Sequence, residues 1–258
     1  MATPEHALMT ALDIVDFSGR DRPSGKRPMD DHQDLQQGLL QTFREACERA
    51  DLRPIQSDIA DRGDGLHVLF ADPLEPARLV ADLPRELLTA LEPFNRRREP
   101  SSRLRVRMAV HEGYVRREPF PWQGDAIIKL VRMLNCAAAS GQIRSHPHQV
   151  LTVTISDSVY QATVEERVRG LQPDQFEPIS VQHDDRSTPF PAWIRLAPKA
   201  SGVSGAADPD AVATPETVEK AETPEARVSN NNSGTTSMGD GSPAFGQVTG
   251  KVSFGGGS

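Results

Sequence analysis

The sequence predicts one α/β (α+β) sandwich domain over residues 1–197, followed by a flexible linker at 198–229 and a tail at 230–258. Segments with the two-residue period of strands alternate with segments of helical period, an order typical of helices packed on a sheet. After Pro198 the composition changes to Ala, Pro, Thr, Glu and Val without a sustained apolar period. Such a segment cannot bury enough surface to offset the entropy of ordering.

The first elements expected are a buried strand, a helix and a hairpin. The strand covers residues 7–15, an apolar run with Asp13 at its polar end. Apolar side chains at helical spacing then predict a helix over 34–52. The runs 55–60 and 66–70 flank the triplet Gly-Asp-Gly, which predicts a hairpin with Asp64 at its tip.

The later elements follow from the same two periods. In chain order they are a helix at 79–91, a half-buried strand at 103–111, a helix at 126–139, a strand at 150–155, a helix at 157–167 and closing strands at 176–181 and 193–196. Together with the first elements they complete the predicted sandwich.

The overall composition excludes several classes of function. A formal charge of −7 argues against nonspecific binding to nucleic acid or to an anionic membrane as the main activity. No apolar run approaches the ~18 residues of a membrane span, and the first ten residues do not have the pattern of a signal peptide. We therefore expect a cytoplasmic protein. Cys47 and Cys136 have no metal or redox spacing, which predicts a packing role in a reducing compartment.

Four short stretches follow one another along the chain: ALDIVDFSGR at 11–20, DRGDGLHVLF at 61–70, RLRVRMAVHEGYV at 103–115 and GDAIIKLVRMLNCA at 124–137. Their order and intervals are those of class III nucleotidyl cyclase catalytic domains, a family that the chain resembles over residues 7–197. The corresponding family patterns are an Asp-Ile-x-Gly-Phe-Thr strand end, a Gly-Asp hairpin, an Arg-x-Gly-x-x-x-Gly strand and a Gly-x-x-x-Asn-x-x-x-Arg helix start. The resemblance implies a ferredoxin-like, cyclase-type sandwich, a nucleoside triphosphate substrate, a Mg²⁺ or Mn²⁺ cofactor and a homodimer.

The same resemblance implies roles for three side chains. Asp13 and Asp64 match the family's two metal-binding aspartates, and two hard cations held by carboxylates stabilise the attacking and leaving oxygens of a phosphoryl transfer. Arg132 matches the arginine that meets developing charge on the phosphate. The alternative is that Asp13 caps a turn and Asp64 serves a tight Asp-Gly turn.

Four positions depart from the family pattern. Ile128 replaces the asparagine that orients the ribose, and Ala60 and Pro121 stand where side chains usually read a purine. Asp16 stands where a glycine is usual and adds a carboxylate near the expected phosphates. These departures argue against purine specificity and leave a pyrimidine substrate, another nucleotide or no catalysis.

Two further patterns favour ordinary surface roles. Eight arginines lie between residues 96 and 117, and the alternating three, Arg103, Arg105 and Arg107, are expected to face solvent on a strand whose other face is buried. His146 and His148 form a His-x-His pair without a third ligand, which predicts a surface turn rather than a zinc site.

The tail has a second resemblance. The sequence SPAFGQVTGKVSF at 242–254 is similar to short bacterial amyloid signalling motifs, in which an effector carries the motif behind a linker and a sensor carries a matching copy. The alternation from Phe245 to Phe254 is suited to stacking with copies of itself. The composition, with eight glycines in residues 230–258, favours a disordered tail instead.

Three functional hypotheses remain open. The first is a divergent cyclase that makes a cyclic nucleotide, with a pyrimidine or another base, in bacterial conflict or stress signalling. In its homodimer, Asp13 and Asp64 of one subunit would face Arg132 of the other. The second is an inactive cyclase-fold module that holds a nucleotide and is joined to a partner protein by a matching tail motif. The third is a scaffold that functions only by tail assembly, a hypothesis that gives the paired aspartates no role.

Overall fold

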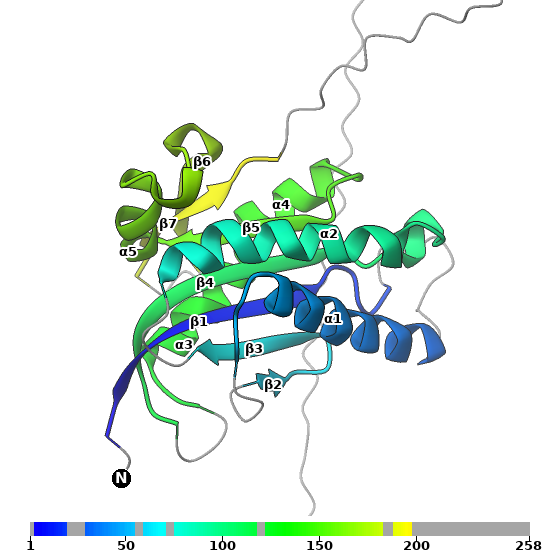
Figure 1. Ribbon diagram of the computed structural model, residues 1–258, viewed down its shortest axis with the longest axis horizontal. Helices are drawn as coiled ribbons and strands as arrows, with labels where there is room; N and C mark the ends of the chain where they lie inside the picture. The colour runs from blue at the N-terminus through cyan, green and yellow to red at the C-terminus, as the bar shows by residue number, and fades with distance from the viewer. Residues whose placement is uncertain are drawn as a thin grey trace, which may run out of the picture. The chain divides into compact units, whose positions relative to one another are not determined.

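A computed structural model describes residues 3–19, 29–54, 59–70, 75–117, 122–182 and 188–197. Its strands form a seven-stranded sheet in the order β2-β3-β1-β4-β5-β7-β6, in which β4 and β5 are parallel and the other neighbouring pairs are antiparallel. The strands are β1 (Glu5–Ile14), β2 (Ile59–Asp61), β3 (Gly65–Phe70), β4 (Val106–Val115), β5 (Leu151–Ser156), β6 (Phe176–Val181) and β7 (Phe190–Arg195). Strand β1 therefore lies between β3 and β4, near the middle of the sheet (Figure 1).

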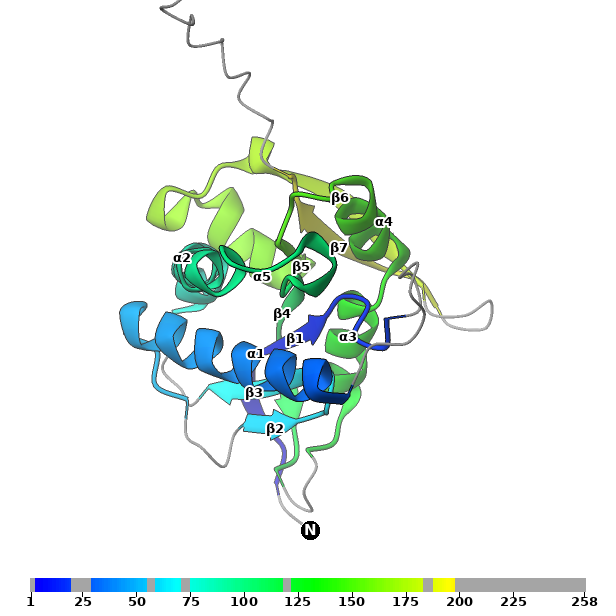
Figure 2. The same ribbon diagram turned by 90° about the vertical axis from the view of Figure 1, so that its right-hand side faces the viewer.

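Helices cover both faces of the sheet. They are α1 (Met29–Arg49), α2 (Leu83–Asn95), α3 (Asp125–Leu134), α4 (Ala137–Ser145) and α5 (Asp157–Tyr160). Helices α1 and α2 lie over one face, and α3 and α4 lie over the opposite face, as the two views together show (Figure 2). The predicted sandwich is confirmed, with a helical layer on each side of the strands.

Each face of the sheet has its own hydrophobic core. Alternate residues of β1 enter the two cores, with Leu8 and Leu12 in the core under α1 and α2 and Met9 and Ala11 in the core under α3. From Ala7 to Ile14 every β1 side chain is buried. A strand covered on both faces needs a nearly continuous apolar sequence, which explains the run that predicted it.

The predicted helix at 126–139 is wrong in one respect, because the structure contains two helices there. Helix α3 ends at Leu134, and Cys136 has an extended backbone and caps α4, its Sγ accepting a hydrogen bond from the Ala139 N–H at 3.4 Å. Leu130, on α3, and Ala139, on α4, are both buried in the same core. The apolar period thus continues across the break, which is why the sequence alone indicated one helix.

The other helices differ from expectation mainly at their ends. The predicted helix at 79–91 begins as a wider, π-type turn at Arg78–Asp82 and continues as α2. Pro84 lies in the first turn of α2, directly after this π-type turn, where the helical hydrogen-bond pattern changes. The helix predicted at 157–167 likewise consists of α5 and a wide turn at Gln161–Glu165.

Some predictions concern residues outside the described ranges. They include the linker at 198–229, the tail at 230–258, part of the first hairpin strand at 55–58, and Pro121. Within the described ranges, no helix is both long enough and apolar enough to cross a membrane.

Candidate functional site

Asp13 lies near the end of β1, where three strands meet side by side. It is in register with Gly65 on β3 and with Arg107 on β4. Because side chains alternate along a strand, Asp13 shares its face with Met9 and Ala11, the face covered by α3 and α4. The Asp13 side chain is 12% exposed, so this carboxylate lies almost inside the domain.

Asp64 lies at the tip of the β2–β3 hairpin, as the sequence predicts, and the hairpin brings it beside Asp13. Its backbone carbonyl accepts a hydrogen bond from the Ile14 N–H at 2.8 Å. Gln36 of α1 donates to the Gly63 carbonyl, and the Asp61 carboxylate accepts from the Gly63 N–H at 2.7 Å. Three separate segments therefore fix the position of this exposed aspartate.

Gly65 makes this approach possible. A Cβ atom at this position would lie 2.1 Å from the Leu12 carbonyl oxygen, far inside van der Waals contact. Any larger residue would push β3 away from β1 at the level of Asp13. The Gly-Asp-Gly sequence is therefore required both by the turn and by the contact between strands.

Replacing Gly65 by alanine is expected to separate the two aspartates and to abolish the stabilisation of the protein by Mn²⁺ with a nucleoside triphosphate. Differential scanning fluorimetry with and without these ligands measures this effect. Gly141→Ala is the matched control, since a Cβ at Gly141, on α4, would meet nothing within 4 Å. Ligand-induced stabilisation that survives in Gly65→Ala to the same extent as in Gly141→Ala would contradict the role given to this contact.

Arg107 pairs with Asp13. Its Nε donates to Asp13 Oδ2 at 3.1 Å, Nη2 also contacts Oδ2, and Nη1 donates to the Ser140 hydroxyl of α4 at 2.8 Å. With its side chain 18% exposed, Arg107 does not face solvent as predicted. The prediction is wrong because α4 covers this face of β4.

Arg105 also departs from the predicted solvent-facing arrangement. Its guanidinium donates to the backbone carbonyls of Gln149, at 3.0 Å, and His146, at 3.1 Å, and also contacts the carbonyl of Ile143. Arg105 thus ties β4 to the end of α4 and the segment that follows it. The two neighbouring arginines have different uses, because only Arg107 contacts a candidate site residue.

The electrostatics of Asp13 favour binding of a cation. Burial raises the pKa of Asp13 above its ordinary value, the charge and hydrogen bonds of Arg107 lower it, and the negative charge of Asp64 raises it again, with a net increase. Asp64 is therefore near enough for the two carboxylates to repel each other. A cation placed between them would relieve this repulsion.

The donor set fits a magnesium or manganese ion. Mg²⁺ in proteins is commonly held by one or two carboxylates, with phosphates and water completing its coordination. Asp13 and Asp64 provide two such carboxylates. Within the described ranges, no group of three or more His, Cys, Asp or Glu side chains could hold a metal by itself.

Arg132 lies in the last turn of α3, and the described contacts include no bond from it to Asp13 or Asp64. Ile128 precedes it by one helical turn and is 49% exposed. Arg132 and Ile128 thus share the outward side of α3, while Leu130 and Met133 are buried. The structure brings Asp13 and Asp64 together and leaves Arg132 on a surface of its own.

His67 was not identified from the sequence, although it lies next to one of the positions expected to read the base. It is in register with Ala60 on β2 and with Ala11 on β1, and Ala60 is buried. Burial, reinforced by the positive charge of Arg62, lowers the pKa of His67 to about 4, so the ring is neutral at pH 7. Its buried Nδ1 has no hydrogen-bond partner in the described part of the chain.

His67 and His111 are expected to make the domain sensitive to acid. Burial lowers the pKa of His111 to about 4 as well, whereas an unfolded histidine titrates near 6.5. Between pH 6.5 and 4 the unfolded chain binds more protons, so stability falls as the pH falls, by about 1.6 kcal/mol per histidine from pH 6.5 to 5. Urea unfolding at both pH values should show a smaller loss in the His67→Gln, His111→Gln variant. An equal loss in both proteins would contradict this assignment.

Three other residues singled out in the sequence can be placed in the structure. Asp16 has a φ of 52°, a left-handed conformation that explains why the family pattern has glycine there. His146 and His148 are exposed at the end of α4 and in the turn that follows, as predicted.

Comparison with known proteins supports the fold. No protein-family model matches the chain, and no curated protein matches it. Among solved structures, the guanylyl cyclase Cya2 is 14% identical with a TM-score of 0.51, over 78% of this chain and 97% of that chain. An adenylate/guanylate cyclase/hydrolase from Silicibacter pomeroyi is 18% identical with a TM-score of 0.50, over 76% and 99%. The chain thus has a mixed α/β fold similar to that of class III cyclase catalytic domains.

Proposed function

We propose that this protein is a divergent nucleotidyl cyclase that binds a nucleoside triphosphate with Mg²⁺ or Mn²⁺ and forms a cyclic nucleotide signal. The observation that carries the proposal is the meeting of Asp13, Asp64 and Arg107 at one point of a cyclase-like sheet. Carboxylates and a guanidinium at one place suit a metal-bound triphosphate, which needs both kinds of group.

The reaction is an intramolecular displacement at phosphorus. The ribose 3′ oxygen attacks the α-phosphorus, its proton is lost to solvent, and the bond to the pyrophosphate oxygen breaks. A divalent cation, when bound, would neutralise charge on the phosphate oxygens. Asp13 and Asp64 would hold the cation, and Arg107, 3.1 Å from Asp13, is near enough to exchange this carboxylate for a phosphate.

The substrate proposed is a pyrimidine nucleotide. Ala60 has no polar side-chain atom for a purine, whereas the neutral ring of neighbouring His67 has an unpartnered Nδ1 beside it. A ring nitrogen that donates or accepts, depending on its tautomer, suits the amide edge of a pyrimidine.

Incubation of the full chain with each of the four ribonucleoside triphosphates and Mn²⁺ tests this proposal. Pyrophosphate release and mass spectrometry of the products should show cyclic CMP or cyclic UMP in excess over the purine products. Products dominated by cyclic AMP would overturn the base assignment, and nucleotide binding without pyrophosphate release would overturn the cyclase assignment.

The second candidate is a nucleotide-binding module without turnover. It is favoured by Ile128, whose exposed apolar side chain stands one turn before Arg132 and cannot bond a ribose hydroxyl. In that case metal and nucleotide stabilise the protein while no product forms.

Recruitment through the tail is compatible with both candidate functions. Residues 230–258 would assemble with a partner protein carrying a similar motif in bacterial conflict or stress signalling, which raises the local concentration of the attached domains. Fibre diffraction on a peptide of residues 230–258 tests this part, and a peptide that stays monomeric with and without seeds would exclude it.

A further inference from the structure

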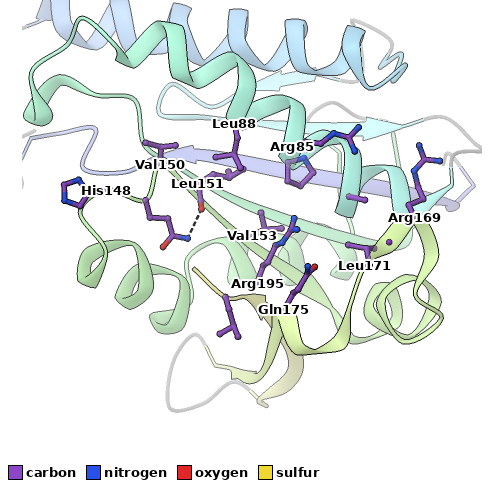
Figure 3. Close-up of a pocket in the computed structure, with 15 residues that line it drawn as sticks. Arg85, Leu88, His148, Val150, Leu151, Val153, Arg169, Leu171, Gln175 and Arg195 are labelled. Atoms are coloured by element: carbon purple, nitrogen blue, oxygen red, sulfur yellow. Dashed lines mark hydrogen bonds between the residues drawn. The ribbon is translucent and has the colours of Figure 1, made fainter. Parts of the chain in front are cut away.

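A pocket of about 430 Å³ lies on the other face of the sheet, away from Asp13 and Asp64. It is bounded by α2, by β5, and by the segments that lead into β6 and out of β7 (Figure 3). Much of its wall is apolar, formed by Pro84, Leu88, Leu151, Val153 and Leu171. Its volume is within the range of about 300–1,000 Å³ that is usual for small-molecule sites.

Arg195 at the end of β7 brings a positive charge into this pocket. It forms no ion pair with any described carboxylate. Its guanidinium makes a long cation–π contact with Phe176, whose ring centroid is 5.9 Å from the guanidinium carbon. Arg195 is half-buried, and this burial lowers the pKa of its guanidinium below the ordinary value. An incompletely hydrated and unpaired cation is costly unless something else compensates it.

The other two arginines of the pocket differ from Arg195. Arg169 and Arg85 both form ion pairs with the buried carboxylate of Asp82, Arg85 at 3.3 Å. Their charges are therefore compensated within the chain. Arg195 alone among the three is left for an external anion.

Two glutamines add polar groups without partners. Gln175 and Gln149 line the pocket, and the Oε1 atom of each is buried without a hydrogen bond in the described part of the chain. Figure 3 shows Gln175 beside Arg195, both reaching from the β7 side of the pocket toward α2. A glutamine amide can turn either its oxygen or its N–H groups toward a bound polar group.

We propose that this pocket binds a small organic anion with an apolar body, namely a medium-chain aliphatic carboxylate. The carboxylate lies against Arg195, and the Gln175 amide turns its N–H toward the same group. The hydrocarbon part packs against Leu88, Leu151 and Val153. This inference is independent of turnover at Asp13 and Asp64, because the two sites lie on opposite faces of the sheet.

Isothermal titration of the full chain with octanoate, and with octanol as the neutral match, tests the proposal. Octanoate should bind at least about tenfold more tightly than octanol, because only the carboxylate can form a charge-assisted hydrogen bond with the Arg195 guanidinium. Arg195→Met should remove this preference. Arg144→Met is the control, because Arg144 is an exposed arginine on α4 that does not line the pocket.

A second pair of variants keeps the test independent of changes at Arg195. Leu88 is 43% exposed on α2, so Leu88→Glu and Leu88→Gln should both fold. The glutamate should weaken octanoate binding at least about tenfold more than the glutamine, through repulsion of the carboxylate. In the absence of octanoate, Arg195→Met should raise the melting temperature, whereas a purely structural arginine would lower it on removal. Equal binding of octanoate and octanol, or unchanged octanoate binding in Arg195→Met, would overturn the proposal.

Discussion

Replacing Asp13 and Asp64 together by asparagine is expected to abolish the stabilisation by Mn²⁺ with nucleoside triphosphate and to reduce turnover by about a hundredfold or more. The reason is that asparagine keeps the shape of each side chain but removes the negative charge that holds the cation. In the wild-type protein, ligand at a hundred times its Kd should add about 2.7 kcal/mol to the stability. Scanning fluorimetry and pyrophosphate release measure the two losses.

The double variant needs a control of equal charge, and Glu165 and Glu166 provide it. Both are exposed beyond α5. Glu165→Gln with Glu166→Gln changes the net charge by the same amount and should leave ligand stabilisation and turnover as in the wild type. Asp13→Asn also leaves Arg107 without its carboxylate, so the variant should unfold at a lower temperature even without ligand. Retained stabilisation by Mn²⁺ and nucleotide in the aspartate variant would refute the site.

Arg132→Ala is expected to depress turnover by about a hundredfold while changing nucleotide affinity only a few-fold. This split follows if the guanidinium acts on charge that develops in the transition state. In the proposed dimer Arg132 of one subunit faces Asp13 and Asp64 of the other. Mixing Arg132→Ala protein with the double aspartate variant should then restore about a quarter of the wild-type activity, because half of the dimers are mixed and each has one intact site of two.

The outcome of mixing distinguishes the proposed arrangement from a site within one chain. An intrachain site predicts no recovery, since every chain in the mixture would carry a defective site. The subunits must exchange, which size-exclusion chromatography of differently tagged proteins verifies. Exchange without recovery of activity would exclude the shared site.

Asp13 and Asp64 could each be singled out because the strand end and the turn that carry them are local in sequence, whereas their proximity was expected only from the resemblance to the cyclase fold. A buried strand ending in a polar residue and a Gly-Asp-Gly turn each have a short signature. In the structure Asp64 lies at the hairpin tip, directly before Gly65, which is in register with Asp13 on β1. The sequence also indicates in part why position 65 is glycine, because glycine in a strand often marks a place where two backbones approach closely.

Arg107 and Arg195 could not be assigned from the sequence, because their surroundings come from distant segments. The alternation on β4 predicts that Arg107 is opposite the buried face, but it does not show that α4 supplies Ser140 over that face. In the same way, Arg195 is the last residue of a strand without a distinctive sequence, and its pocket is completed by α2 and by Leu171. The period of apolar residues in a segment predicts which of its side chains share a face. Which helix covers that face depends on tertiary contacts that the period does not show.

The ion pair between Arg107 and Asp13 has a consequence for how the two ligands of the proposed site depend on each other. A cation alone must take Asp13 away from Arg107, and a triphosphate alone must take Arg107 away from Asp13. Either ligand by itself therefore meets the full cost of breaking the pair, and the second one to arrive does not. By thermodynamic reciprocity each ligand then raises the affinity for the other by the same factor. The site would respond to the simultaneous presence of metal and nucleotide rather than to either one, so it behaves as a coincidence detector.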